Sequence, residues 1–260
     1  MADIIIRECT TIDELDNCVR MQRDVFRLPD LEISPRRHLI VSRQAGGWTL
    51  GAFASDRLVG FVHHLAAVRN GNEIFGYSHM MAVDPDFQNQ GVGAKLKWQQ
   101  RERAMAEGRT FIKWTWDPMQ ARNAHFNLNR LGVTVADYAT NFYGTDYPPP
   151  SPAETDAPGI DSDRLFAQWQ LGSPRVVQLA SGAAGQDMET RPAATIGIPT
   201  NWNKLCAENP GEAKEEQLRV RGEFQKAFAA GLVCAGFDRT QEQPSYLLYE
   251  RGQIYREAVV

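Results

Sequence analysis

The sequence lacks the features that mark several large classes of protein. No stretch of about 18 or more apolar residues occurs, so we expect no membrane-spanning segment. The first residues, Met1 to Arg7, have neither the basic region nor the long apolar region of a signal peptide, and they predict a first strand instead. Lys and Arg number 28 against 32 Asp and Glu, which gives a net charge of -4, and the basic residues are scattered. We therefore expect no nucleic-acid partner and no membrane partner.

Cysteine is scarce and widely spaced. The four cysteines, Cys9, Cys18, Cys206 and Cys234, form no metal-ligand spacing. In a chain of 260 residues they are most simply buried thiols, which predicts a cytoplasmic protein without structural disulfides. The histidines have no paired cysteine or carboxylate close in sequence, so we expect no metal.

What the sequence does contain is a glycine-punctuated segment between Val83 and Ala94. A strand-like run, Tyr77 to Val83, stops at a turn containing Pro85, and an amphipathic helix is predicted from about Val92 to Glu107. Backbone N–H groups and the positive end of the helix dipole would then point at one place, which suits an anion such as a pyrophosphate. A tight turn into a packed helix is the alternative interpretation of the same residues.

Two common phosphate motifs do not fit this segment. A Walker loop needs Lys and Ser or Thr directly after its second glycine, whereas Ala94 and Lys95 follow Gly93. The dinucleotide fingerprint needs a third glycine where this chain has Leu96. Both nucleotide-binding classes are thereby excluded.

The order of predicted elements gives the segment its context. Thr11 and Glu14 form a capping box that starts a helix after the first strand. Three antiparallel strands follow, then the glycine loop and its helix, and then a strand at Phe111 to Trp116 that we expect to be parallel to the one ending at Val83. Apolar residues on both strand faces predict helices on both sides of the sheet. Further predicted elements are a helix at 121–131, strands at 165–171, 195–198, 233–237 and 246–249, and a helix at 213–230.

The residues Gln88, Gly91 and Gly93 match the pattern Gln/Arg-x-x-Gly-x-Gly/Ala, and the segment resembles the acyl-CoA-binding loop of the GNAT acyltransferase superfamily. Val83-x-Pro85 before the loop, and Asn123 with Leu131-Gly132 after it, add to the resemblance. It extends over Ile4 to Tyr143, a little over half of the chain. It implies an α/β fold, with a mixed α+β sheet as a GNAT-like acyltransferase core and an α+β C-terminal extension.

The resemblance also implies a domain organisation. Residues 1–147 would be the acyl-CoA-binding catalytic core, and residues 148–162, rich in proline, would be a linker. Residues 163–260 would form an extension that covers the acceptor side of the cleft. Its arginines Arg164, Arg219 and Arg221 would either bind a substrate carboxylate or lie solvated on the surface.

The expected co-substrate is acetyl-CoA or another acyl-CoA. Its pantetheine arm would pair with the backbone of Met81, Ala82 and Val83, one of whose N–H groups would polarise the thioester carbonyl. Asn123 would contact the donor from the side or, alternatively, serve as a helix N-terminal hydrogen-bond group. The pyrophosphate would be held by the loop, whose residues are Gln88, Asn89, Gln90, Gly91, Val92, Gly93 and Ala94.

The proton chemistry departs from the family pattern. Where many GNAT proteins have a tyrosine as the acid, this chain has Leu128, so Tyr143 or Tyr138 would have to take its place. For the base, His79 is our first choice, because histidine titrates near neutral pH, and Glu73 is our second. His79 is expected to share a pleat face with Tyr77 and Met81, and His63 and His64 to point to opposite faces. A strand histidine is otherwise a core residue.

The sequence thus predicts an N-acyltransferase that moves an acetyl or other short acyl group from acyl-CoA to the amine of a small molecule, such as an amino acid, by direct attack. A succinyl-type acyl donor is the alternative enzyme. A non-catalytic acyl-CoA-binding module is the alternative to an enzyme. The expected partner is a small-molecule amine, and a homodimer is left open.

Overall fold

The chain forms two compact units, Met1–Trp114 and Thr115–Val260. The computed structural model describes residues 3–26, 30–145, 159–182, 191–240 and 242–255. Residues 148–158 of the predicted linker therefore lie outside the described residues. The functional division into core, linker and extension stays a prediction.

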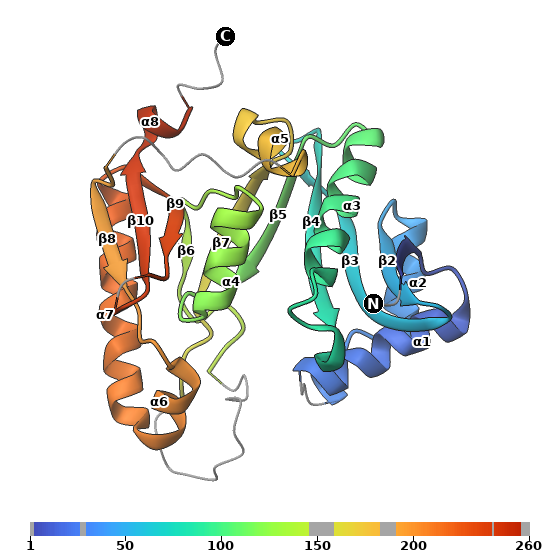
Figure 1. Ribbon diagram of the computed structural model, residues 1–260, viewed down its shortest axis with the longest axis horizontal. Coiled ribbons are helices and arrows are strands. Elements are labelled where there is room, and N and C mark those ends of the chain that lie inside the picture. The colour runs from blue at the N-terminus through green and yellow to red at the C-terminus, as the bar shows by residue number, and fades with distance from the viewer. Residues whose placement is uncertain (1–2, 27–29, 146–158, 183–190, 241, 256–260) are drawn as a thin grey trace. The chain divides into compact units, whose positions relative to one another are not determined.

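The first unit is built on a mixed sheet in the order β1-β2-β3-β4-β5 (Figure 1). Neighbouring strands from β1 to β4 are antiparallel, and β4 and β5 are parallel, as the sequence predicts. The strands are β1 (Ile4–Glu8), β2 (Trp48–Ala54), β3 (Arg57–Arg69), β4 (Glu73–Val83) and β5 (Phe111–Trp116). The helical segments are α1 (Ile12–Met21), η1 (Gln22–Phe26), η2 (Asp30–Glu32), α2 (Arg36–Gln44), η3 (Pro85–Phe87) and α3 (Val92–Ala106).

Helices cover both faces of this sheet. His63 and His64 are neighbours on β3, and their side chains therefore point to opposite faces. His63 bonds Ser42 of α2, whereas His64 bonds Gln100 of α3. Helices α2 and α3 thus lie on opposite faces, and the predictions of a doubly covered sheet and of divergent histidines are confirmed.

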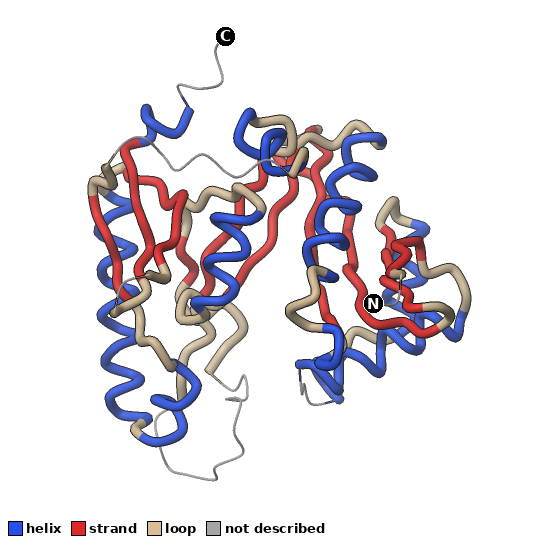
Figure 2. The backbone as a smooth tube through the Cα atoms, in the orientation of Figure 1, coloured by secondary structure: helices blue, strands red, loops and turns tan. Residues whose placement is uncertain are grey.

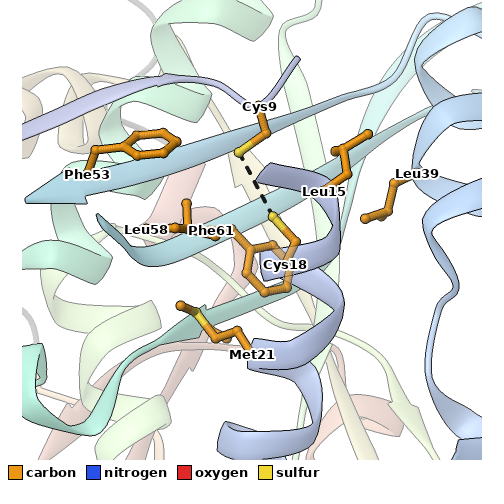
Figure 3. Packing of buried hydrophobic residues seen from close by; sticks show 9 residues of the cluster. Cys9, Leu15, Cys18, Met21, Leu39, Phe53, Leu58 and Phe61 are labelled. Atoms are coloured by element: carbon orange, nitrogen blue, oxygen red, sulfur yellow. Dashed lines mark hydrogen bonds between the residues drawn. The ribbon is translucent and has the colours of Figure 1, made fainter. Parts of the chain in front are cut away.

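Helix α1 packs on the sheet through a small apolar cluster (Figure 3). Its residues Leu15, Cys18 and Met21 are buried with Phe53 and Phe61 of the sheet, and each large side chain contributes roughly 1.5–3 kcal/mol by leaving water. Cys9 and Cys18 are free thiols whose sulfur atoms lie 3.9 Å apart.

The predicted capping box of α1 is confirmed. The Glu14 N–H donates to Thr11 Oγ1 at 3.3 Å, and the Thr11 N–H donates to the Glu14 carboxylate at 3.1 Å. These bonds satisfy N–H groups that the start of a helix leaves without partners.

The second unit contains its own sheet in the order β8-β10-β9, which α7 contacts through β8 and β9 (Figure 2). The predicted C-terminal strands and long helix are confirmed within a few residues. The strands are β6 (Tyr138–Ala139), β7 (Arg164–Gln170), β8 (Ala194–Gly197), β9 (Leu232–Asp238) and β10 (Ser245–Glu250). The helical segments are α4 (Ala121–His125), η4 (Phe126–Arg130), α5 (Pro174–Ala180), α6 (Trp202–Glu208), α7 (Pro210–Ala229) and α8 (Arg251–Tyr255).

The predicted helix at 121–131 is in fact composite. An α-helical turn, α4, continues as the π-helical segment η4. In the part of the chain that the structure describes, no helix has both the length and the apolar character needed to cross a membrane.

Candidate functional site

The glycine loop connects the end of β4 to the start of α3. A short 3-10 turn, η3, follows β4, and the chain then passes through two left-handed residues, Asn89 (φ 60°) and Gly91 (φ 81°). Gly91 is the N-cap of α3 and has no side chain with which to cap the helix. Left-handed backbone is readily adopted by glycine, which explains its place here.

The loop leaves the N–H groups at the start of α3 without intrahelical partners. The first bond of the helix runs from the Lys95 N–H to the Gly91 carbonyl at 3.0 Å, so the N–H groups of Val92, Gly93 and Ala94 precede it. The Gln88 side chain fixes the loop by donating to the Val83 carbonyl at 3.0 Å. A Cβ built at Gly91 would meet no atom within 4 Å, so the space in front of this residue is open. These features suit an anion.

Strand β4 extends beyond its pairing with β5. The two strands pair at Gly76 with Ile112 and at Tyr77 with Lys113, whereas β4 continues through residues 78–83. On its other side β4 pairs with β3 as far as Val83. The predicted pantetheine contacts Met81, Ala82 and Val83 lie in this extended part, next to the loop.

A β-bulge lies at His79. The register between β3 and β4 passes from His63 with Met80 to His64 with Ser78, which leaves His79 as the extra residue. The prediction that His79 shares a pleat face with Met81 is therefore wrong. The His79 ring contacts His38 of α2, while Met81 lies within 3.5 Å of the Cβ position of Gly93 on α3, the opposite face. The bulge inverts the alternation between the two residues, which sequence spacing cannot reveal.

The two predicted bases occupy different environments. His79 is exposed, and its Nε2 lies 3.2 Å from Ser34 Oγ. Partial burial of its ring and the neighbouring His38 lower its pKa. Glu73 pairs with Arg69 at 2.5 Å, and that hydrogen bond lowers the pKa of its carboxyl. His79 lies six positions after Glu73 along the strand, a distance of roughly 20 Å, so the two side chains cannot act on the same proton.

The other predicted site residues belong to the second unit. Asn123 is exposed on α4, whose N-cap residue, Gln120, makes no side-chain capping bond. Tyr143 is 48% exposed, and its hydroxyl lies 3.5 Å from Thr115 Oγ1. The alternative acid, Tyr138, donates to Asp163 at 2.6 Å, and burial together with this bond raises its pKa. Leu128, at the position of the family tyrosine, is fully buried.

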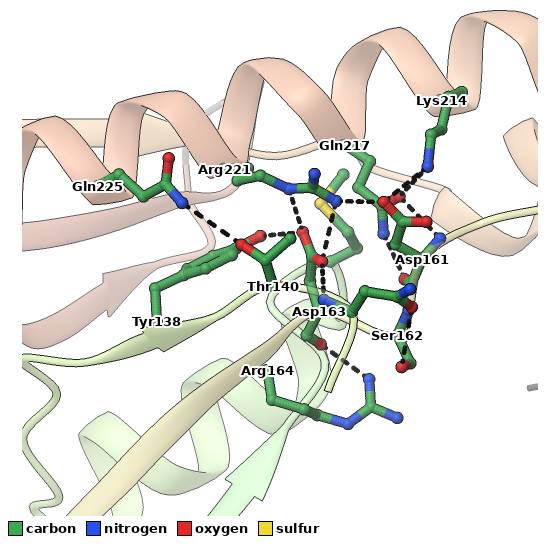
Figure 4. Close-up of polar contacts among 12 residues, drawn as sticks. Tyr138, Thr140, Asp161, Ser162, Asp163, Arg164, Lys214, Gln217, Arg221 and Gln225 are labelled. Carbon is green, nitrogen blue, oxygen red and sulfur yellow. Dashed lines mark hydrogen bonds and ion pairs between the residues drawn. The ribbon is translucent and has the colours of Figure 1, made fainter. Parts of the chain in front are cut away.

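Two of the three arginines considered as carboxylate binders, Arg219 and Arg221, have carboxylate partners in the second unit, whereas Arg164 donates to the Asp163 backbone carbonyl at 2.8 Å (Figure 4). Arg221 donates from Nε and one terminal nitrogen to both oxygens of Asp163, at 2.9 and 3.0 Å, and also contacts Asp161. Arg219 pairs with Glu216 and Glu223. Both guanidinium groups are therefore used within the protein. A hollow of about 440 Å³ near α6 and α7 contains none of the predicted site residues.

Within the described residues, no group of three or more His, Cys, Asp or Glu side chains has the geometry to hold a metal ion. Histidine 38 is the residue that sequence reasoning missed. It belongs to α2, a helix that was not predicted, and it contacts the rings of both His63 and His79.

Comparison with known proteins agrees with this geometry. Residues 13–132 match the Acetyltransferase (GNAT) family. The ribosomal-protein-S18-alanine N-acetyltransferase of Escherichia coli superposes with a TM-score of 0.51 at 15% identity, over 65% of this chain and 94% of that one. An N-acetyltransferase from Staphylococcus aureus Mu50 gives a TM-score of 0.51 at 13% identity, over 65% and 99% of the two chains. No curated protein matches the sequence.

At these identities the two structures establish the fold, and the sequence match establishes the family of the domain. The chain thus carries a GNAT acetyltransferase domain over residues 13–132.

Proposed function

We propose that this protein is an N-acyltransferase that moves an acetyl or other short acyl group from acyl-CoA to the amine of a small molecule, such as an amino acid. The observation that carries the proposal is the continuous surface from the β4 extension to the loop. Residues 78–94 contain three features in succession. The first is the bulge that carries His79, the second is the part of β4 beyond its pairing with β5, and the third is the start of α3, which suits an anion.

The roles follow from the chemistry of these groups. The amides of residues 88–94 would bind the pyrophosphate of the donor, and the edge at residues 81–83 would pair with its pantetheine arm. His79 would accept the proton of the acceptor ammonium, and the freed amine would attack the thioester carbonyl. We prefer His79 to Glu73, because the carboxylate is paired with Arg69 at the far end of the strand.

The acid that protonates the leaving thiolate is assigned to Tyr143, because Tyr138 is committed to Asp163. One observation favours the alternative of a non-catalytic acyl-CoA-binding module, namely the buried Leu128 at the tyrosine position. We further propose that residues 163–260 select the acceptor, and that the four free cysteines reflect a cytoplasmic protein.

Two measurements test the proposal. Thiol release from acetyl-CoA and succinyl-CoA, assayed over a panel of small amines, should exceed the amine-free rate for at least one pair. Binding without any thiol release would favour the binding module.

The second measurement is CoA-dependent thermal stabilisation of Gly91→Val, compared with Gly71→Val as a matched control. Both glycines have left-handed backbone (φ 81° and 84°) and open space at Cβ, so each valine costs roughly 1–2 kcal/mol of strain. Only Gly91→Val should lose the response to CoA. An equal CoA response in both variants would refute the assignment of the loop.

A further inference from the structure

Three histidine rings from three different elements lie against one another in the first unit. They are His38 on α2, His63 on β3 and His79 on β4. The ring centroids are 5.5 Å apart for His38 and His63, 5.8 Å for His38 and His79, and 6.1 Å for His63 and His79, all with edge-to-face geometry. The chemistry open to this cluster depends on which of its ring nitrogens already have hydrogen-bond partners.

His63 is fully committed. Ser42 Oγ donates to the Leu39 carbonyl at 3.0 Å, so toward His63 Nε2, at 3.2 Å, it acts as the acceptor. His63 therefore carries its proton on Nε2, and Nδ1 accepts from Thr49 Oγ1 at 2.8 Å. Burial lowers the pKa of His63 to about 3. This ring stays neutral and is a wall of the cluster rather than a base or a metal ligand.

His38 is different, because its Nε2 is buried and has no hydrogen-bond partner among the described atoms. The other buried histidine of this unit, His64, bonds Gln100 through Nδ1 and Arg109 through Nε2. A buried nitrogen without a partner destabilises a fold. A hydrogen bond of Nε2 therefore does not explain why a histidine occupies position 38.

The His79 ring lies beside His38 and reaches the surface at the bulge. The charged residues of the neighbouring elements are accounted for elsewhere or solvated: Arg36 of α2 pairs with Asp16, and Arg37 of α2 and Arg23 and Asp24 of η1 are exposed. His38 thus contacts the His79 ring without a hydrogen bond that fixes its own Nε2. It displaces water from that ring, and any proton that it takes repels a proton on His79.

We propose that His38 is a positioning residue for His79, which keeps the His79 ring in the unprotonated form that accepts a proton from the acceptor ammonium. The proposal rests on the proposed role of His79. In the step it serves, one ring nitrogen of His79 takes H⁺ from R–NH₃⁺, and the lone pair of the resulting R–NH₂ forms the new bond to the acyl carbon. The thiolate leaves with the C–S electron pair and is protonated by the proposed acid, Tyr143. The second proton lost by the amine nitrogen replaces the one that Tyr143 gave, so that an amide, a free thiol and His79 carrying one H⁺ result.

The first test needs no substrate. Ring NMR signals of histidine-labelled protein are followed against pH in the wild type, in His38→Asn and in His125→Asn, with His79 assigned by its loss in His79→Asn. His125 is the matched control, because its Nδ1 is also buried without a partner but lies on α4 of the second unit. The titration midpoint of His79 should rise in His38→Asn and stay unchanged in His125→Asn.

Thermal unfolding separates this role from a structural one. His38→Asn should lose no more stability than His125→Asn, since neither removes a hydrogen bond of the orphan nitrogen. An unchanged or lower His79 midpoint in folded His38→Asn would overturn the proposal. If His38→Asn does not fold, His38→Gln, which is closer in size, takes its place in the same comparison.

The second test uses acetyl-CoA with the amine that gives thiol release. The acidic limb of the kcat/KM profile should move to higher pH in His38→Asn, with the alkaline limb unchanged. If the titration midpoint of His79 shifts but the acidic limb of the kcat/KM profile does not, the contact between His38 and His79 does not serve catalysis, and the proposal is overturned. Absence of thiol release in the wild type would instead refute the proposed function, while the NMR result still decides the coupling between the two rings.

Discussion

Two regions of this protein, the network around Asp163 in the second unit and the glycine loop with His38 in the first unit, differ in how their polar groups are satisfied. In the second unit, Asp163 accepts hydrogen bonds from Tyr138, Arg221 and the Asn141 N–H, and Asp161 pairs with Arg221 and Lys214. In the first unit, the amides that open α3 precede its first hydrogen bond, and His38 Nε2 is buried without a partner. The Asp163 network has partners for its charged groups, whereas the loop and His38 leave polar groups without such a partner among the described residues.

This difference separates groups that hold a fold together from groups that act on a ligand. A saturated ionic network offers nothing to a substrate, because each charge is already neutralised nearby. Unsatisfied amides and nitrogens cost stability and are retained where a ligand completes them. We therefore expect substitutions in the glycine loop and at His79 to change activity, and substitutions in the Asp163 network to change stability.

The largest effect is expected for His79→Asn. Loss of a general base typically lowers the rate by about 10²–10⁴-fold, and the exposed position of His79 predicts little change in stability. Steady-state kcat/KM by thiol release, together with thermal unfolding, checks both parts. His125→Asn is the control and should retain its rate. A kcat/KM within a few-fold of the wild type in His79→Asn would transfer the role of base to another group.

The converse is expected for Asp163→Ala in the second unit. Asp163 is 1% exposed, and its removal leaves the Tyr138 hydroxyl without its acceptor and Arg221 with Asp161 as its remaining carboxylate partner among the described residues. Breaking such a network typically costs about 3–5 kcal/mol. Denaturant unfolding measures the loss, and the KM for acyl-CoA should be unchanged below the unfolding transition.

The matched control for Asp163→Ala is Glu223→Ala, which breaks a largely solvated pair with Arg219 and should cost at most about 1 kcal/mol. Similar losses in the two variants would show that burial of the Asp163 network does not matter. A raised KM for acyl-CoA in Asp163→Ala would contradict the division of roles between the units.

The sequence predicts the parts of this molecule that local signals determine. Thr11 and Glu14 mark the start of α1, and the glycines mark the loop, because caps and left-handed backbone restrict residue type directly. Helix α2 escapes prediction, since Pro35 gives no side-chain cap and Leu39, Ile40 and Val41 are contiguous rather than spaced by a helical turn. The bulge at His79 depends on how β4 pairs with β3. The histidine cluster depends on this bulge and on helix α2, so neither the bulge nor the cluster has a local sequence signal.

The smallest effect is expected for Gly93→Ala. This one substitution should change the stability of the free protein and the binding of CoA in opposite directions. Gly93 lies in the first turn of α3, and a Cβ there would meet Met81 and Val83 at ordinary contact distances of 3.5 and 3.9 Å. Alanine should therefore stabilise the free protein by roughly 0.5–1 kcal/mol. The same methyl group should hold a phosphate away from the amides and weaken the thermal response to CoA.

Gly222→Ala in α7 is the control for Gly93→Ala, because it makes the same change in a helix where the Cβ meets no atom within 4 Å. It should raise the unfolding midpoint of the free protein and leave the increment caused by CoA unchanged. Gly93→Ala should raise the unfolding midpoint of the free protein and reduce the increment caused by CoA. Thermal scans with and without CoA measure both quantities in one experiment. If both variants keep the full CoA increment, the phosphate does not approach the backbone at residue 93, and the unsatisfied amides of the first unit would need another ligand to explain them.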